Sequence, residues 1–227
     1  MATFLYNSSI GKKLVMSVTG VFLVLFILFH MSMNIAALFS ADAYNMICAF
    51  LGASWYALAG TAVLAAGVAI HFIYALILTV QNRKARGNVR YAVTVQEKGV
   101  DWSSKNMLVL GIIVLVGLAL HLFNFWSKMQ LVEIMGQHTN SLGLSPTDGA
   151  ALIEYTFSQW YYVVLYLIWF AALWFHLTHG VWSMFQTVGW ANQTWYPRLK
   201  CIANIVATII FLGFAAVVVV FFVKSIC

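Results

Sequence analysis

Charged residues are scarce in this sequence. Its 227 residues include 12 Lys and Arg and 6 Asp and Glu, so 8% of the chain is charged while 63% is hydrophobic. Soluble globular domains have roughly a quarter of their residues charged, so this chain has too few to cover a surface exposed to water. The high apolar content also excludes intrinsic disorder. An integral membrane protein is the class that remains.

Proline and cysteine are also rare, and each shortage excludes something. The two prolines, Pro146 and Pro197, fall outside the long apolar stretches, so no proline interrupts them. The cysteines, Cys48, Cys201 and Cys227, form no Cys-x-x-Cys motif, and their spacing suits neither a zinc site nor an iron–sulfur cluster. We interpret them as apolar packing residues.

Five apolar stretches are long enough to cross a bilayer, which takes about 20 helical residues. None contains Asp, Glu, Lys or Arg. Backbone groups in lipid need internal hydrogen bonds, so we expect an all-α membrane protein, a bundle of five transmembrane helices forming one domain. The first stretch is too long for a signal peptide and no small-residue cleavage site follows it, so we expect it to be retained. The predicted spans are 14–39, 55–80, 107–126, 160–190 and 202–223.

The basic residues predict the orientation of these spans. Lys12 and Lys13 precede the first span, six basic residues lie in 81–105, and Arg198 and Lys200 precede the last span. Five spans place all of these on one side, and basic loops stay in the cytoplasm. We therefore expect a multi-pass protein of the bacterial inner membrane with a cytoplasmic N-terminus and an outside C-terminus. The net charge of +6 is then a topology signal, and nucleic-acid binding is not expected.

Two outer segments carry weaker signals. Segment 40–54 is apolar but broken by Asp42, and we expect it to lie along the membrane interface. In segment 129–159, Ser145 and Pro146 predict the start of a helix, with the serine as its cap and the proline in its first turn.

Four histidines lie inside the first four spans, one in each: His30, His71, His121 and His176. At 1.5 Å per residue, His30 and His121 lie within roughly 10–15 Å of the outer surface, and His71 and His176 roughly 24 Å below it. Two histidines at each of two depths fit two bis-histidine b haems, whereas zinc normally takes four ligands at one depth. Hydrogen bonding to a neighbouring helix is the alternative for any single histidine.

Glycines lie one helical turn from three of these histidines, at Gly67, Gly117 and Gly180. Residues four apart share a helix face, so a glycine there allows a flat porphyrin close to the backbone. Ordinary packing of small residues explains any one of them equally well. His176 is preferred as a ligand over His179, which shares its span, because Gly180 lies on the face of His176.

The sequence around the histidines resembles a known family, the single-subunit, five-helix, di-haem cytochrome b membrane anchor of succinate dehydrogenases and fumarate reductases. The resemblance covers nearly the whole chain, and its motifs are specific together and weak singly. They are SSIGKK at 8–13, TGVFLVLFILFHMSMN from Thr19, AIHFIYA around His71, LALHLFNFW around His121 and FHLTHGVWSMFQTVGW from Phe175.

The resemblance implies ligands and partners. His30 and His121 would ligate an outer haem, His71 and His176 an inner one, and Ser17 would contact a propionate of the inner haem. The alternative for Ser17 is a hydrogen bond to its own helix. A flavoprotein that handles the dicarboxylate and an iron–sulfur subunit would dock on the cytoplasmic face. This chain would react with menaquinone or another quinone and carry no dicarboxylate chemistry itself; succinate oxidation and fumarate reduction both fit.

The sequence departs from the family pattern at Trp174, where some members place a glutamate on a transmembrane proton route. No span contains a carboxylate that would replace it. A quinone site needs a proton donor or acceptor beside the ring oxygens. Near the outer face the candidates are Asn34, Asp42, Asn124 and Glu133, each with a capping or solvent-facing role as the alternative.

Two other functions remain as alternatives. The cytochrome b subunit of a hydrogenase or formate dehydrogenase would keep the haems and change the partner, but the pattern around His176 and the regular order of histidines favour the succinate dehydrogenase family. A transporter with a histidine proton relay would usually show broken helices and repeats, and neither is visible in the sequence.

Overall fold

The structure, a computed structural model, describes residues 8–86 and 101–227. In these two ranges the regular structure is helical, without strands, and five helices are long and apolar enough to cross a membrane. The expected all-α membrane bundle is therefore confirmed. The five helices are α2 (Ser9–Phe39), α4 (Trp55–Arg86), α6 (Met107–Asn124), α9 (Trp160–Ser183) and α10 (Trp195–Ile226).

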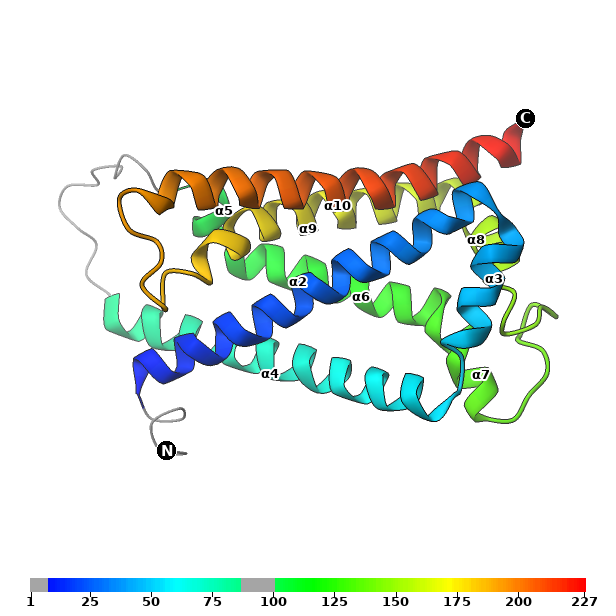
Figure 1. Ribbon diagram of the computed structural model, residues 1–227, viewed down its shortest axis with the longest axis horizontal. Coiled ribbons are helices and arrows are strands. Elements are labelled where there is room, and N and C mark those ends of the chain that lie inside the picture. The colour runs from blue at the N-terminus through cyan, green and yellow to red at the C-terminus, as the bar shows by residue number, and fades with distance from the viewer. Residues whose placement is uncertain (1–7, 87–100) are drawn as a thin grey trace.

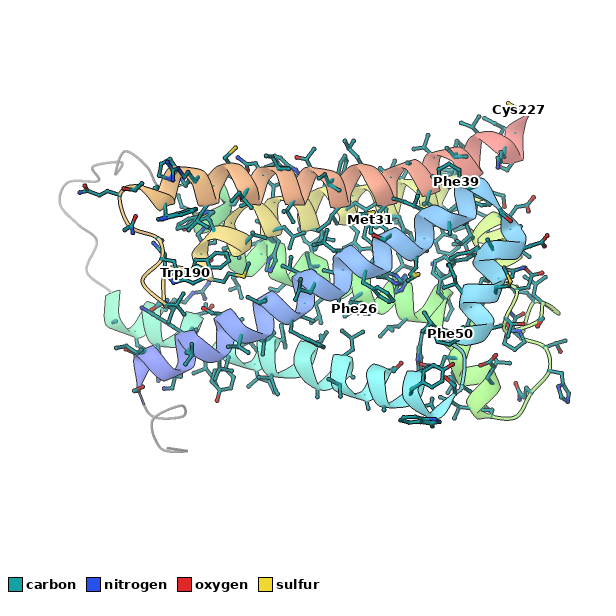
Figure 2. The ribbon with its side chains drawn as sticks, in the orientation of Figure 1. Phe26, Met31, Phe39, Phe50, Trp190 and Cys227 are labelled. Carbon is teal, nitrogen blue, oxygen red and sulfur yellow. The ribbon has the colours of Figure 1, made fainter. Side chains whose placement is uncertain are left out.

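Short helices gather at the two ends of the bundle (Figure 1). We call the end at which α2 begins the inner end, following the predicted orientation, and the opposite end the outer end. Figure 2 marks them with Trp190 and Cys227, respectively. Helix α5 (Trp102–Lys105) lies at the inner end. The outer end holds α3 (Ala41–Phe50), the 3-10 turn η1 (Trp126–Lys128), α7 (Gln130–Ile134) and α8 (Gly149–Phe157).

Helix α9 is the most buried span and forms the centre of the core. Helix α10 packs along it through Ala203 and Ala207, whose exposure is 0%. Small side chains let two helices approach closely. In lipid, where the hydrophobic effect does not drive helices together, the van der Waals contacts of such packing stabilise their association. The indole nitrogen Nε1 of Trp174 in α9 also donates to Oγ1 of Thr208 in α10 at 3.0 Å. Trp174 thus links two helices.

Helix α2 lies between α4 and α10 and contacts both (Figure 1). Its contact with α10 is close at Gly213, where a Cβ would overlap the side chain of Met31. Helix α4 packs mainly on α2, and none of its most apolar 18-residue segment is buried by the described part of the chain. The helix that carries His71 is therefore held chiefly by one neighbour.

Four predicted boundaries at the inner end are displaced. Helix α2 begins at Ser9, before the expected residue 14, and α4 ends at Arg86, after the expected residue 80. Helix α9 ends at Ser183, before the expected residue 190, and α10 begins at Trp195, before the expected residue 202. The chain turns between them because Gly189 adopts a φ of 80° and the rings of Phe185 and Trp190 stack at 5.7 Å. A count of apolar residues does not detect this turn, since it is itself largely apolar.

The predicted helix start at Ser145 is wrong. Ser145 and Pro146 lie in a turn in which the carbonyl of Ser145 accepts from the amide of Asp148 at 3.0 Å. Helix α8 is capped instead by Asp148, whose carboxylate accepts from the amide of Ala151 at 3.1 Å. Asn45 of α3 donates to the same carboxylate oxygen at 2.8 Å, so a contact from another helix fixes this cap. Such a contact is invisible in the local sequence.

Candidate cofactor-binding site

The outer histidines lie side by side. His30 extends from α2 and His121 from α6, and their ring centroids are 5.7 Å apart with the ring planes at 81°. Both rings are half-buried. The structure thus brings together the two outer histidines that the depth comparison paired. The pair is enclosed by four aromatic rings with centroids within 6 Å of one of the imidazoles, those of Phe26, Phe125, Trp169 and Phe214.

Asn34 fixes the hydrogen-bonding state of His30. The amide nitrogen Nδ2 of Asn34 donates to the carbonyl of His30 at 2.8 Å and lies 3.4 Å from Nε2 of the same residue. The amide oxygen accepts from the hydroxyl of Tyr44 in α3 at 3.1 Å, which settles the orientation of the amide group. Because an amide nitrogen only donates, His30 Nε2 is the unprotonated ring nitrogen when this contact forms, and its lone pair faces the Asn34 amide.

At the inner level, Thr19 contacts a ring nitrogen of His71. Its hydroxyl donates to the carbonyl of Val15 at 2.8 Å, and its oxygen lies 3.0 Å from Nδ1 of His71. When the single hydroxyl hydrogen stays within α2, Thr19 accepts and His71 Nδ1 carries the proton. Nε2 of His71 is then unprotonated. Metal-binding histidines commonly have this arrangement, in which the second ring nitrogen donates to an oxygen that fixes the tautomer.

The structure distinguishes His176 from His179. Both residues have a buried Nδ1 without a hydrogen-bond partner among the described residues, so this feature does not separate them. His176 is the one that lies near enough to His71 for the two rings to influence each other's charge. His179 instead packs on Trp182 at 5.0 Å and interacts with Asp101 and Lys200. The position of His176 therefore matches the predicted inner pair better than that of His179.

The separation of the outer pair can be compared with that of two histidines bound to one metal ion. Two axial imidazoles, each bound through a nitrogen–metal bond of about 2 Å, have centroids roughly 6 Å apart. The observed separation of 5.7 Å is close to this value. Within 8–86 and 101–227 no group of three or more His, Cys, Asp or Glu is placed to hold a metal ion. The four intramembrane histidines therefore do not gather in one cluster within these ranges. The contact of His30 with His121 is the predicted pair that a ring contact shows, and what the histidines bind stays a prediction.

The glycines beside the histidines have other neighbours. A Cβ at Gly117 would overlap the indole of Trp169, and a Cβ at Gly67 would lie 2.8 Å from the ring of Phe22. Gly180 has nothing within 4 Å among the described residues. At the first two positions the glycine admits an aromatic side chain from a neighbouring helix, which is ordinary helix packing. Only Gly180 leaves open space of the kind expected beside a porphyrin.

The predicted quinone-site residues do not form one cluster. Asn34 contacts His30, as described above. Asn124 is 2% exposed and its amide donates to the hydroxyl of Tyr166 at 3.4 Å. Asp42 is exposed in the first turn of α3, and Glu133 borders a cavity of about 340 Å³ that His138 also lines. Of the four, Asn34 is the one that contacts an outer histidine within the described chain.

Ser17 is buried and its hydroxyl donates to the carbonyl of Lys13 at 3.0 Å, with Thr187 Oγ1 at 3.4 Å. This is the bond to its own helix that was the alternative to a propionate contact. The propionate contact itself stays a prediction.

Four residues beside the histidines or their partners were not predicted from the sequence. Thr19 is described above, and Tyr44 orients Asn34. Gly20 and Gly111 lie opposite the inner histidines: a Cβ at Gly20 would be 3.7 Å from Cε1 of His71, and one at Gly111 would be 3.9 Å from Cε1 of His176. The two glycines are on different helices from the rings that they face. Sequence spacing along one helix gives no signal for such contacts.

Two ionisable groups of α3 are neutral near pH 7. Burial raises the pKa of the Cys48 thiol to about 11. Burial also raises the pKa of the Tyr44 phenol, and the neighbouring Cys48 adds to the effect. Tyr44 therefore keeps its proton and remains a hydrogen-bond donor to Asn34.

Comparison of the chain with protein-family models, curated proteins and solved structures finds no match.

Proposed function

We propose that this chain is a di-haem cytochrome b membrane anchor of a succinate:quinone or quinol:fumarate oxidoreductase. The single observation that carries the proposal is the contact of His30 with His121, two histidines from different spans at 5.7 Å. The tautomer that Thr19 imposes on His71 supports it, because His71 Nε2 is then free to bind a metal. A b haem held by two histidines supplies one-electron transfer.

The protein residues in this proposal bind, orient and exclude water. His30 and His121 hold the outer group, and His71 and His176 hold the inner one. The aromatic rings around the outer pair keep water away from it. Asn34 and Tyr44 present an amide and a neutral hydroxyl beside His30. They are the proposed polar groups for a quinone oxygen near the outer pair, and the quinone would replace one of their present hydrogen bonds. Menaquinone is the expected quinone.

The proposal also includes partners. A flavoprotein that handles the dicarboxylate and an iron–sulfur subunit would dock on the inner face, which is the cytoplasmic face in the predicted orientation. Electrons would pass between the iron–sulfur subunit and the quinone through this chain. The chain contributes the quinone-reactive site and leaves the chemistry of succinate and fumarate to the partner. The inner membrane of a bacterium is the proposed location.

The proposal is tested by isolating the tagged chain from its native membranes in mild detergent. We expect flavin and succinate:quinone activity to elute with it, and a short-chain naphthoquinol to reduce its haem. Haem without flavin, together with hydrogenase or formate dehydrogenase activity, would favour the alternative partner. A haem-free chain that conducts protons in liposomes would favour the histidine relay and contradict the proposal.

A further inference from the structure

A cluster of aromatic and charged residues lies at the inner end, beyond the inner histidines. We call it the inner-end cluster, formed by His179 and Trp182 of α9, Tyr196 and Lys200 of α10, and Asp101 before α5. The ring of Trp182 meets His179 at 5.0 Å and Tyr196 at 5.1 Å. The Lys200 ammonium lies 5.5 Å from the centroid of Trp182 and 2.9 Å from the Asp101 carboxylate. The cluster brings a cation onto the face of a buried indole.

Two of these ring nitrogens lack a hydrogen-bond partner. Trp182 is 7% exposed, and neither its Nε1 nor Nδ1 of His179 has a partner among residues 8–86 and 101–227. An indole N–H only donates, so the missing partner of Trp182 is an acceptor. His179 also donates at Nδ1 when it takes that tautomer. A buried donor without an acceptor is unfavourable and rare in folded proteins, so these nitrogens point to a ligand.

The charge beside the donors indicates what the acceptor is. Lys200 favours an anion over a neutral carbonyl, because a hydrogen bond to a charged acceptor is roughly twice as strong as a neutral one. The bond between Lys200 and Asp101 does not block such a ligand. Both side chains reach solvent, with exposures of 27% and 44%, and ion pairs of this kind exchange readily.

We propose that Trp182, His179 and Lys200 form a binding site for one oxyanion, a carboxylate or a phosphate. Two sources supply this chemistry at the inner end. Trp182 lies six residues beyond His176, about 9 Å along α9, so one source is a propionate of the inner haem. This source rests on the proposed function. The other source is the phosphate of an anionic lipid headgroup at the membrane surface, and it is independent of the proposed function.

Trp182→Phe in the full-length protein tests the site, because it keeps the ring and removes the N–H. Trp174→Phe is the matched control, since it removes an indole N–H whose acceptor is the hydroxyl of Thr208. In the first arm, haem-depleted protein is titrated with haem and with haem dimethyl ester, which lacks free carboxylates. We expect the native protein and the control to prefer haem, and Trp182→Phe to lower this preference about tenfold.

In the second arm, native mass spectrometry counts lipids retained by haem-free protein in phosphatidylglycerol and in phosphatidylcholine. Loss of one phosphatidylglycerol in Trp182→Phe, but not in Trp174→Phe, would assign the site to a lipid phosphate. Lys200→Gln is expected to reproduce either loss, so the test survives if Trp182→Phe fails to fold. Variants that match the control in both arms would overturn the proposal. Failure of the native protein to bind any haem would contradict the proposed function and leave the second arm as the test of this site.

Discussion

Replacing Gly117 by alanine tests how tightly the outer pair is packed. Gly117 of α6 lies under the indole of Trp169 in α9, and an added Cβ would overlap three atoms of that ring. The indole has little freedom to move away, because its Nε1 donates to the carbonyl of Val114 at 3.0 Å. Relief requires that the ring leave this bond or that α6 and α9 separate. Trp169 also packs on His121 at 5.9 Å, so either movement disturbs the outer pair.

The control is Gly60→Ala in α4, where nothing among the described residues lies within 4 Å of the added atom. Both substitutions gain the same intrinsic helix propensity, which cancels in the comparison. Overpacking costs about 1–3 kcal/mol, and a lost hydrogen bond costs about 0.5–1.5 kcal/mol. Together they make Gly117→Ala less stable than Gly60→Ala by about 1.5–4.5 kcal/mol.

Equilibrium unfolding of the two variants in mixed micelles, followed by circular dichroism, measures this difference. The native protein is measured beside them in the same detergent. Equal stability of Gly117→Ala and Gly60→Ala would refute the packing of Trp169 against Gly117 and, with it, the placement of α6 against α9.

Three further predictions follow from individual contacts. Thr19→Val removes the acceptor of His71 Nδ1, so we expect the inner haem to bind about 10–100-fold more weakly. Haem content measures this loss, and Thr19→Ser should restore binding. Unchanged haem content in Thr19→Val would contradict the proposed tautomer of His71. Cys227 is exposed at the outer end, whereas burial raises the pKa of Cys48 to about 11 and leaves its thiol protonated and unreactive at pH 8. A membrane-impermeant maleimide should therefore label Cys227, but not Cys48, in intact spheroplasts. If Cys227 is labelled only after lysis, the predicted orientation is reversed. The amide of Gln130 accepts from Thr61 and Trp126 and donates to the carbonyl of Gly52, so it connects three segments at the outer end. Gln130→Leu removes these hydrogen bonds and should lower the free energy of unfolding by about 2 kcal/mol or more. A smaller loss would contradict this network.

The spans were predictable from sequence because apolar length alone decides whether a helix can cross a bilayer. The contact of His30 with His121 was predictable for a related reason, since rise per residue is constant along a helix and places both residues at a similar level. The end of α9 at Ser183 was not predictable, because most residues from Met184 to Trp190 are apolar and the turn depends on Gly189.

Contacts between helices account for the rest of what sequence analysis missed. Nothing near Thr19 in the sequence shows that its hydroxyl meets His71, because the two residues are far apart along the chain. The same holds for Asp148, whose role as the cap of α8 depends on Asn45. Gly117 illustrates the converse error: its spacing from His121 indicated space for a porphyrin, and the space is filled by Trp169 from another helix.

The most direct test of the account is the number of haems that each chain binds, measured by pyridine haemochrome assay and a reduced-minus-oxidised spectrum. The native protein should bind two. His121→Ala and His71→Ala should each remove a different spectral component, the double variant should remove both, and His179→Ala should keep two. Absence of haem from the native protein when haem is supplied, or loss of the same component in both single variants, would contradict two histidine pairs at two depths.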